Sequence, residues 1–403
     1  MQRDLTLGTD DVYPRQRALF DAYVAYYTRR LKELYDRRGE KWNRDFSSPE
    51  AYERSVEPNR EHFRQTLGGW PWERGPLGLE REPVAELPGF RVERVHYTVF
   101  EEVRTDALLL LPEGEGPFPA VLCQVGVNGA PETILGFTEI SRDPDNAYHQ
   151  VGRRLAGHGY AVIGTRMVTG VTPGVVRDQD HRAPHLMSEV QREVREYLLA
   201  NYDKDVAKDF GAGTRSRIYL DRLCRMMGHN LLGTEMFALS RAVDVLEALP
   251  EVRSDRIGMY GLSQGGMSAL WLPALEKRII ATVASASFNE RYTKQVVSLP
   301  EQGPFVLGSS EDKFFDHMSE FADSDKASLI PPRAFCVESG RDDGAVFWKT
   351  ADAAFAEIKA IYEKLGLPEK CELVRHEGGH ELERVEDIAD ARVVKFLDRW
   401  LKT

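Results

Sequence analysis

Cysteine and long apolar runs are scarce in this 403-residue sequence, and basic residues are outnumbered by acidic ones. Each of these features argues against a class of protein. The four cysteines lie far apart with no CxxC pair, which argues against a zinc ribbon or a disulfide scaffold and favours a reducing compartment. No apolar run approaches the ~20 residues that a membrane span needs. Lysine and arginine number 53 against 64 acidic residues, and the net charge of −11 disfavours nucleic acid and anionic lipid as partners.

The apolar residues that are present indicate a folded, globular protein. Hydrophobic residues make up 42% of the chain and aromatic residues 10%, which is enough for a large core. The first residues, MQRDLTLGTDDVYPRQ, contain no apolar stretch like that of a secretory signal peptide. We therefore expect a soluble, cytoplasmic protein that does not associate with membranes.

Residues 1–88 carry the pattern of a helical N-terminal segment. Apolar and aromatic side chains recur at helical spacing from Tyr13 to Arg38. A second helix is predicted from Pro49 to Leu67, with Ser48 as its N-cap. We interpret the aromatic stripe as packing against a larger body. A subunit interface that forms a homo-oligomer through these helices, or the lining of a substrate site, is the alternative.

From Phe90 onward the pattern changes to strands that alternate with helices. This alternation predicts the α/β class, with a mostly parallel central sheet covered by helices on both faces. Residues 89–403 are interpreted as one catalytic domain. The expected strands are 90–100, 105–111, 118–125, 160–165, 256–260, 279–284, 333–338 and 371–376, and the expected helices are 146–157, 231–249, 264–275, 345–365 and 388–401.

Two stretches interrupt this alternation, at about residues 167–230 and 287–332. Each follows the carboxyl end of an expected strand, which is where open α/β sheets place their sites. We interpret both as cap-type insertions that build the substrate pocket.

The strongest local motif is Gly261-Leu262-Ser263-Gln264-Gly265-Gly266. It follows the expected strand RIGMY and opens an expected helix, which is the context that a G-x-S-x-G nucleophile turn requires. Glycine at 261 and 265 would avoid collisions with the adjoining strand and helix. We therefore predict that Ser263 is a catalytic nucleophile exposed at the carboxyl edge of the sheet.

A nucleophilic serine needs a base, and the base needs an acid that orients it. In hydrolases with this turn, the chain order is serine, acid, histidine. Asp343 follows the strand RAFCVE and lies deeper in its loop than Asp342 or Glu338, so we select Asp343 and keep the other two as alternatives.

The base is expected in the loop after the strand CELVRH. His380 follows Gly378 and Gly379, which would let the loop approach the serine, and we select it over His376, which ends the strand. For the oxyanion hole, the backbone N–H of Gln264 is the first donor. The second donor is expected from 126–128, with Val127 selected over Gly126 and Asn128.

These motifs resemble the α/β-hydrolase superfamily, and most closely its acetyl xylan esterase, cephalosporin-C deacetylase and dienelactone-hydrolase-like esterases. The resemblance covers about Phe90 to Lys402 and is carried by LPEVRSDRIGMYGLSQGG, IPPRAFCVESGRDD and GGH. It implies an α/β-hydrolase fold and hydrolysis of carboxylic esters, often acetyl esters, without a cofactor or a metal. Where dienelactone hydrolases proper use cysteine, this chain has Ser263.

The leading hypothesis is a serine esterase acting on a small-molecule ester through Ser263, His380 and Asp343. A C–C bond or amide hydrolase using the same triad is the second hypothesis, favoured by the insertions and the N-terminal helices. A non-catalytic ligand-binding protein on the same fold is the third.

Overall fold

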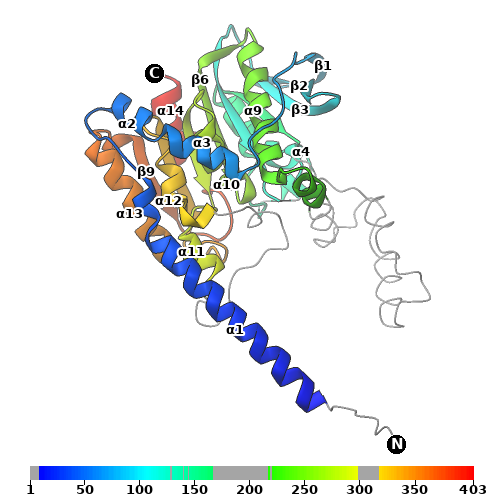
Figure 1. Cartoon of the computed structure of the whole chain (residues 1–403). Coiled ribbons are helices and arrows are strands. Elements are labelled where there is room, and N and C mark those ends of the chain that lie inside the picture. Colours follow the sequence, from blue (N-terminus) through cyan, green and yellow to red (C-terminus); the bar gives the residue numbers. More distant parts are fainter. Residues whose placement is uncertain are drawn as a thin grey trace, which may run out of the picture.

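The structure, a computed structural model, describes residues 9–127, 129–138, 140–143, 145–166, 217, 220–297 and 317–403. Within these ranges the strands form one nine-stranded sheet in the order β1-β2-β3-β5-β4-β6-β7-β8-β9 (Figure 1). The pairs β1–β2, β2–β3 and β3–β5 are antiparallel, and all pairs from β5 to β9 are parallel. The mostly parallel sheet that the sequence predicted is therefore confirmed.

Every strand except β1 overlaps an expected strand, and β6 begins four residues earlier than expected. They are β1 (Glu80–Leu87), β2 (Phe90–Phe100), β3 (Val103–Pro112), β4 (Phe118–Gln124), β5 (Ala161–Thr165), β6 (Val252–Leu262), β7 (Ile279–Ser285), β8 (Ala334–Gly340) and β9 (Cys371–His376). The parallel strands bury both faces, as near-continuous apolar runs such as those of β4 and β5 require.

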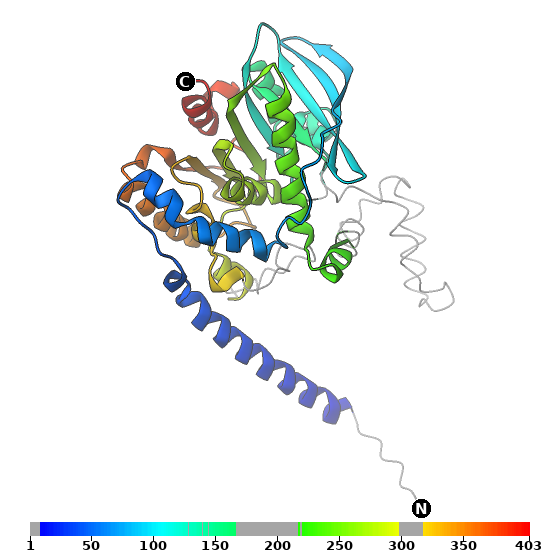
Figure 2. The ribbon, with the colours of Figure 1, turned by 45° about the horizontal axis from the view of Figure 1, so that its top comes forward.

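Helices cover both faces of the sheet (Figures 1 and 2). One face packs against α9 (Leu231–Ala248), α10 (Gln264–Leu275) and α13 (Trp348–Lys364), which share a core with α2 and α3. The other packs against α4 (Pro131–Leu135), α5 (Val151–Gly157) and α14 (Arg392–Leu401). Alternate residues of β4 enter the two cores, with Leu122 on one side and Cys123 on the other. This alternation is the period-2 geometry of a strand between two helical layers.

The N-terminal segment is helical up to Thr66 and then departs from the expectation. It contains α1 (Thr9–Asp36), α2 (Pro49–Ser55) and α3 (Glu57–Thr66), and Ser48 caps α2 by accepting from the Ala51 N–H at 3.1 Å. The single helix expected over 49–67 is broken at Val56, because Pro58 in the next turn cannot donate to a continuous helix. Residues 80–87, expected within the helical segment, form the edge strand β1 instead. The division into an N-terminal segment and a catalytic domain stays a prediction.

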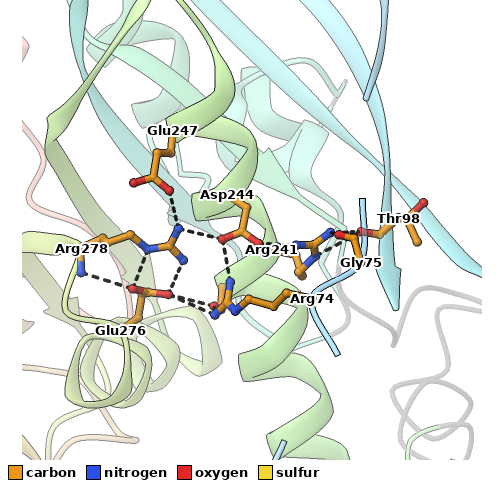
Figure 3. A network of polar contacts seen from close by, with 9 residues as sticks. Arg74, Gly75, Thr98, Arg241, Asp244, Glu247, Glu276 and Arg278 are labelled. Carbon is orange, nitrogen blue, oxygen red and sulfur yellow. Dashed lines mark hydrogen bonds and ion pairs between the residues drawn. The ribbon is translucent and has the colours of Figure 1, made fainter. Parts of the chain in front are cut away.

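A network of charged side chains fastens the N-terminal segment to α9 and to the end of α10 (Figure 3). Arg74 and Arg278 both pair with Asp244, at 2.6 and 2.7 Å. Arg241, from the same helix as Asp244, also pairs with it and donates to the carbonyl of Gly75 at 2.8 Å. Since the network joins partly buried groups from three segments, it orients the N-terminal segment on the body.

The two expected insertions are described only in part. Of 167–230, the described residues are 217 and 220–230, so most of that prediction lies outside the described residues. Of 287–332, the described parts include α11 (Arg291–Gln295) and α12 (Asp323–Ala327). Phe288, in the second insertion, is buried in the core against Phe335 and Phe355.

Candidate active site

The turn between β6 and α10 holds Ser263 in a backbone conformation that side chains rarely adopt. Its φ is 63° and its ψ is −119°. The Ser263 N–H donates to the Ser285 carbonyl of β7 at 3.0 Å, and its carbonyl accepts from the Met267 N–H at 2.9 Å. A strained residue persists only where its surroundings fix it, and such residues gather at functional sites. The geometry is that of the strand–turn–helix predicted for the nucleophile.

Glycine is required at two positions of this turn. A Cβ atom on Gly261 would lie 2.2 Å from the Gly265 carbonyl oxygen, and one on Gly265 would lie 2.0 Å from the Gln124 carbonyl oxygen. Both distances are far inside van der Waals contact. The collisions anticipated from the motif are therefore confirmed. Because glycine avoids them, α10 can begin directly against β4 and β6.

The acid and base loops meet at the same edge of the sheet because β8 and β9 are parallel neighbours. Their backbones are joined by hydrogen bonds from the Arg341 N–H to the His376 carbonyl at 3.0 Å and from the Asp342 N–H to the Gly378 carbonyl at 2.9 Å. Gly340 allows this approach, since a Cβ there would lie 2.1 Å from the Gly378 oxygen.

Asp343 and His380 are brought together. Both carboxylate oxygens of Asp343 lie 3.0 Å from His380 Nδ1. Asp343 Oδ1 also accepts from the backbone N–H groups of Ala345, at 2.7 Å, and Val346, at 3.2 Å. The Asp343 carboxylate is fully buried, whereas the His380 side chain is 37% exposed. This is the arrangement of an acid that fixes the tautomer of a histidine facing solvent or substrate.

The competing acids and the competing histidine have other environments. Asp342 is exposed. Glu338 is fully buried within β8, where it accepts from the Tyr260 hydroxyl at 2.8 Å and from the Glu383 N–H at 2.9 Å. Burial raises the pKa of Glu338. His376 is buried at the end of β9. Among the described residues, Asp343 is thus the carboxylate that His380 contacts.

Ser263 and His380 are not joined by a hydrogen bond among those of the described residues. Both follow parallel strands at the same edge of the sheet, Ser263 after β6 and His380 after β9. Catalytic hydrogen bonds are often long in a free enzyme and tighten when substrate binds.

The loop after β4 lies directly against Ser263. A Cβ on Gly126 would lie 3.2 Å from Ser263 Cβ. The Gly126 N–H donates to the Tyr148 hydroxyl at 2.9 Å, so it is not free to bind an oxyanion. Val127 is half-buried, and Asn128 lies outside the described residues. Gln264, the other predicted donor, begins α10, where the first N–H groups have no intrahelical acceptor.

A buried charged cluster, which the sequence analysis did not identify, supports the acid loop. Asn289 accepts from the Phe347 N–H at 3.2 Å, and its own N–H donates to Asp323 at 3.1 Å. Asp323 also pairs with Arg291 at 2.8 Å and Lys326 at 3.1 Å. Burial lowers the pKa of Lys326 to about 8. No local motif marks this cluster, because its members come from different turns and α12.

A second buried ion pair is hydrogen-bonded to Gln264, the residue after Ser263. Arg217 and Glu235 form a two-point ion pair at 2.6 and 3.0 Å, and both are buried. Glu235, on α9, also accepts from the Gln264 side-chain amide at 3.2 Å. Arg217, from the first insertion, is therefore linked to Gln264 through Glu235, a connection that spacing along the chain could not reveal.

The described ranges contain no group of three or more His, Cys, Asp or Glu side chains arranged to hold a metal ion. In the same ranges, no helix is both long enough and apolar enough to cross a membrane. A cavity of about 380 Å³ lies between the N-terminal segment and α12 and α13, lined by Trp42, Phe46 and Asp325 among others. It includes none of the predicted catalytic residues.

Comparison with known proteins identifies related esterases. Residues 231–306, which span α9, β6, the Ser263 turn, α10 and β7, match the family model described as acetyl xylan esterase (AXE1). The provisionally named hydrolase YtaP of Bacillus subtilis (strain 168) is 28% identical over 187 residues, which are 46% of this chain. The chain spans about 59% of the length of this curated relative.

Solved structures show the same fold at low sequence identity. A Bacteroides fragilis protein provisionally described as an acetyl xylan esterase has a TM-score of 0.58 at 17% identity, over 88% of this chain and 83% of its own. A glucuronoyl esterase from Solibacter usitatus has a TM-score of 0.52 at 15% identity, over 87% of this chain and 93% of its own. The α/β-hydrolase fold that the sequence predicted is confirmed. The chain therefore has the fold of these esterases, and its residues 231–306 are similar to the acetyl xylan esterase family.

Proposed function

We propose that the protein is a serine hydrolase that cleaves carboxylic esters through Ser263, His380 and Asp343. The observation that carries the proposal is the contact between buried Asp343 and half-exposed His380, at the sheet edge that also bears the strained Ser263 turn. The acetyl xylan esterase match over residues 231–306 supports the same reaction class.

In the first half of the reaction, His380 takes the proton of Ser263 as Oγ attacks the ester carbonyl. The tetrahedral oxyanion is bound by the backbone N–H groups of Gln264 and Val127. Collapse of the intermediate expels the alcohol, which receives the proton from His380. An acyl-enzyme on Ser263 remains.

In the second half, water attacks the acyl-enzyme by the same route, with His380 again acting as base. Asp343 holds the imidazole in the tautomer whose Nε2 can accept a proton, and it stabilises the imidazolium that forms. Because Asp343 also accepts two backbone N–H groups, its position is fixed before substrate binds.

The substrate class that we propose is short acyl esters, acetyl esters first. On a panel of p-nitrophenyl esters, acetate should be turned over roughly tenfold or more faster than decanoate, because each excess methylene must find space in a site sized for a small acyl group. The panel is run beside acetylated xylan, an anilide and a 1,3-diketone. Turnover of the diketone or the anilide, with no activity on any ester, would establish the C–C or amide alternative instead.

We also propose that α1 pairs with α1 of a second copy of this chain. The helix projects from the body in both views (Figures 1 and 2), and it is attached at its C-terminal end, where Tyr35 stacks on Tyr292 at 5.1 Å between ring centroids. Large hydrophobic side chains on it are 43–64% exposed, a patch that soluble proteins usually cover. They are Leu19, Phe20, Tyr23, Val24, Tyr26, Tyr27 and Leu34.

Charge placed in this patch should separate the copies. The double variant Phe20→Glu, Tyr27→Glu should sediment as a folded monomer where the wild type sediments as a dimer, because both side chains are exposed within one copy of the chain. Gln16→Glu, also exposed on α1, is the matched control and should remain dimeric. A wild type that is monomeric at micromolar concentration would contradict the proposal.

Cytoplasmic localisation remains part of the proposed function, and the four unpaired cysteines support it.

A further inference from the structure

Tyr148 lies beside the predicted catalytic site although no sequence motif includes it. Its ring is half-buried and packs against the core that contains α4 and α5. Its hydroxyl oxygen accepts a hydrogen bond from the Gly126 N–H at 2.9 Å. Because Gly126 directly precedes Val127, the phenol fixes the backbone that is proposed to supply the second oxyanion donor.

The same hydroxyl lies close to the nucleophile. A Cβ atom built on Gly126 would be 3.0 Å from Tyr148 Oη and 3.2 Å from Ser263 Cβ, so both atoms border the small space above this glycine. Tyr148 Oη and Ser263 Cβ are therefore at most about 6 Å apart, a gap that one acyl oxygen bonded at about 2.7 Å to the phenol can bridge.

The segment that carries Tyr148 is also fastened to the base loop. The carbonyl of Ala147 accepts from the Leu382 N–H at 2.9 Å. On the other side of Tyr148, His149 Nε2 lies 2.9 Å from a carboxylate oxygen of Glu381. Both partners come from the residues that immediately follow the predicted base. Tyr148 therefore joins the loop after β4 to the loop that carries His380.

The backbone after Tyr148, like that of Ser263, has positive φ values. His149 and Gln150 have φ values of 45° and 53°, in the left-handed region that residues other than glycine seldom occupy. Such conformations persist where neighbouring contacts enforce them, and they gather at functional sites. The strain indicates that the position of this segment is maintained by its contacts with the catalytic loops.

The phenol retains a proton that it can donate. A tyrosine hydroxyl carries one proton and can accept as well as donate, and the Gly126 bond uses it as acceptor. Burial raises the pKa of Tyr148, so the hydroxyl stays protonated at neutral and moderately alkaline pH. A buried, fixed donor beside a reacting centre stabilises charge that develops there.

We propose that Tyr148 is a third oxyanion donor, whose hydroxyl binds the acyl oxygen of the tetrahedral intermediate together with the N–H groups of Gln264 and Val127. The inference rests on the proposed esterase function and deepens it. No covalent bond to Tyr148 forms or breaks. Its hydrogen bond strengthens as the acyl oxygen becomes negative, so it favours the transition state over the bound ester.

Replacing the hydroxyl tests the proposal. Tyr148→Phe should lower kcat on p-nitrophenyl acetate on the order of 10²-fold with little change in KM, because the lost bond is made mainly in the transition state. Its affinity for an alkyl boronic acid, which forms a tetrahedral adduct with the serine, should fall in parallel. Tyr160→Phe is the matched control, since that hydroxyl donates to Asp398, and it should keep wild-type kcat. A Tyr148→Phe enzyme with wild-type kcat would overturn the inference.

A second variant keeps the shape of the side chain in case Tyr148→Phe misfolds. Incorporation of 3,5-difluorotyrosine at position 148 introduces a more acidic phenol. Activity should then be lost at alkaline pH, where the phenolate cannot donate and repels the oxyanion, whereas the wild type keeps its activity there. An unaltered pH profile would contradict the role. The wild-type rate and its loss in Ser263→Ala test the proposed esterase function, and the ratio of the position-148 variants to the wild type tests this inference alone.

Discussion

Ser263→Ala should lower kcat for p-nitrophenyl acetate by a factor on the order of 10⁵–10⁶, because the acyl-enzyme cannot form without the Ser263 hydroxyl. The residual rate above that of water would come from the oxyanion donors and from binding. Ser263 is also the expected site of labelling by a fluorophosphonate probe, so the variant should no longer be labelled. Mass spectrometry of the labelled wild-type protein should place the adduct on the peptide that contains Ser263.

Ser254→Ala provides a matched control on the same strand. Ser254 lies in β6, the strand that precedes Ser263, but it is exposed near the opposite end of that strand. This control should keep the wild-type rate and the wild-type labelling. Near-normal turnover or labelling in Ser263→Ala would remove Ser263 as the nucleophile. Absence of labelling in the wild type, together with absence of turnover on every substrate of the panel, would favour a ligand-binding protein on this fold.

Asp343→Asn should lower kcat by a factor on the order of 10⁴. An amide in place of the carboxylate can present N–H to His380 Nδ1, which selects the tautomer whose Nε2 carries the proton and cannot act as base. The variant also exchanges a charged acceptor of the Ala345 and Val346 N–H groups for a neutral one, so a loss of about 1–3 kcal/mol in the free energy of unfolding is expected. Steady-state kinetics are therefore measured beside a denaturant titration.

The neighbouring residue supplies the control for this variant. Asp342→Asn removes the same charge one residue earlier, from an exposed side chain, and should leave kcat unchanged. Glu338→Gln addresses the third acid, which is buried with Tyr260 rather than with His380. If either of these variants carried the large loss and Asp343→Asn did not, the assignment of Asp343 as the orienting acid would be wrong.

The parallel core could be predicted from the sequence because its periodicity is strong. The bounds of α10 and β9 agree with those expected from the pattern. The helix expected over 146–157 begins only at Val151, because the left-handed conformations of His149 and Gln150 are incompatible with a helix. That conformation depends on contacts with distant loops, which no local pattern records.

Strand β1 could not be predicted for a different reason. Its sequence, EREPVAEL, is exposed along nearly its whole length, so no alternation of buried and exposed residues marks it. Proline at position 83 lies beside a shift in the register with β2, and proline is tolerated on an edge strand. The composition of residues 80–87 does not favour a strand. They form β1 because β2 has a free edge with which they can pair.

The residue types of the candidate site could be predicted from the sequence alone. A serine between glycines after a strand, then an acid and a histidine after two later strands, can meet only at one edge of a parallel sheet. The tertiary structure decided which acid faces the histidine. Asp342 and Asp343 are neighbours in one loop, and the hydrogen bond from the Asp342 N–H to Gly378 turns the first side chain to solvent and the second inward. The tertiary structure also brought Tyr148 close to Ser263. Spacing along the chain could not predict this, because it depends on long-range packing.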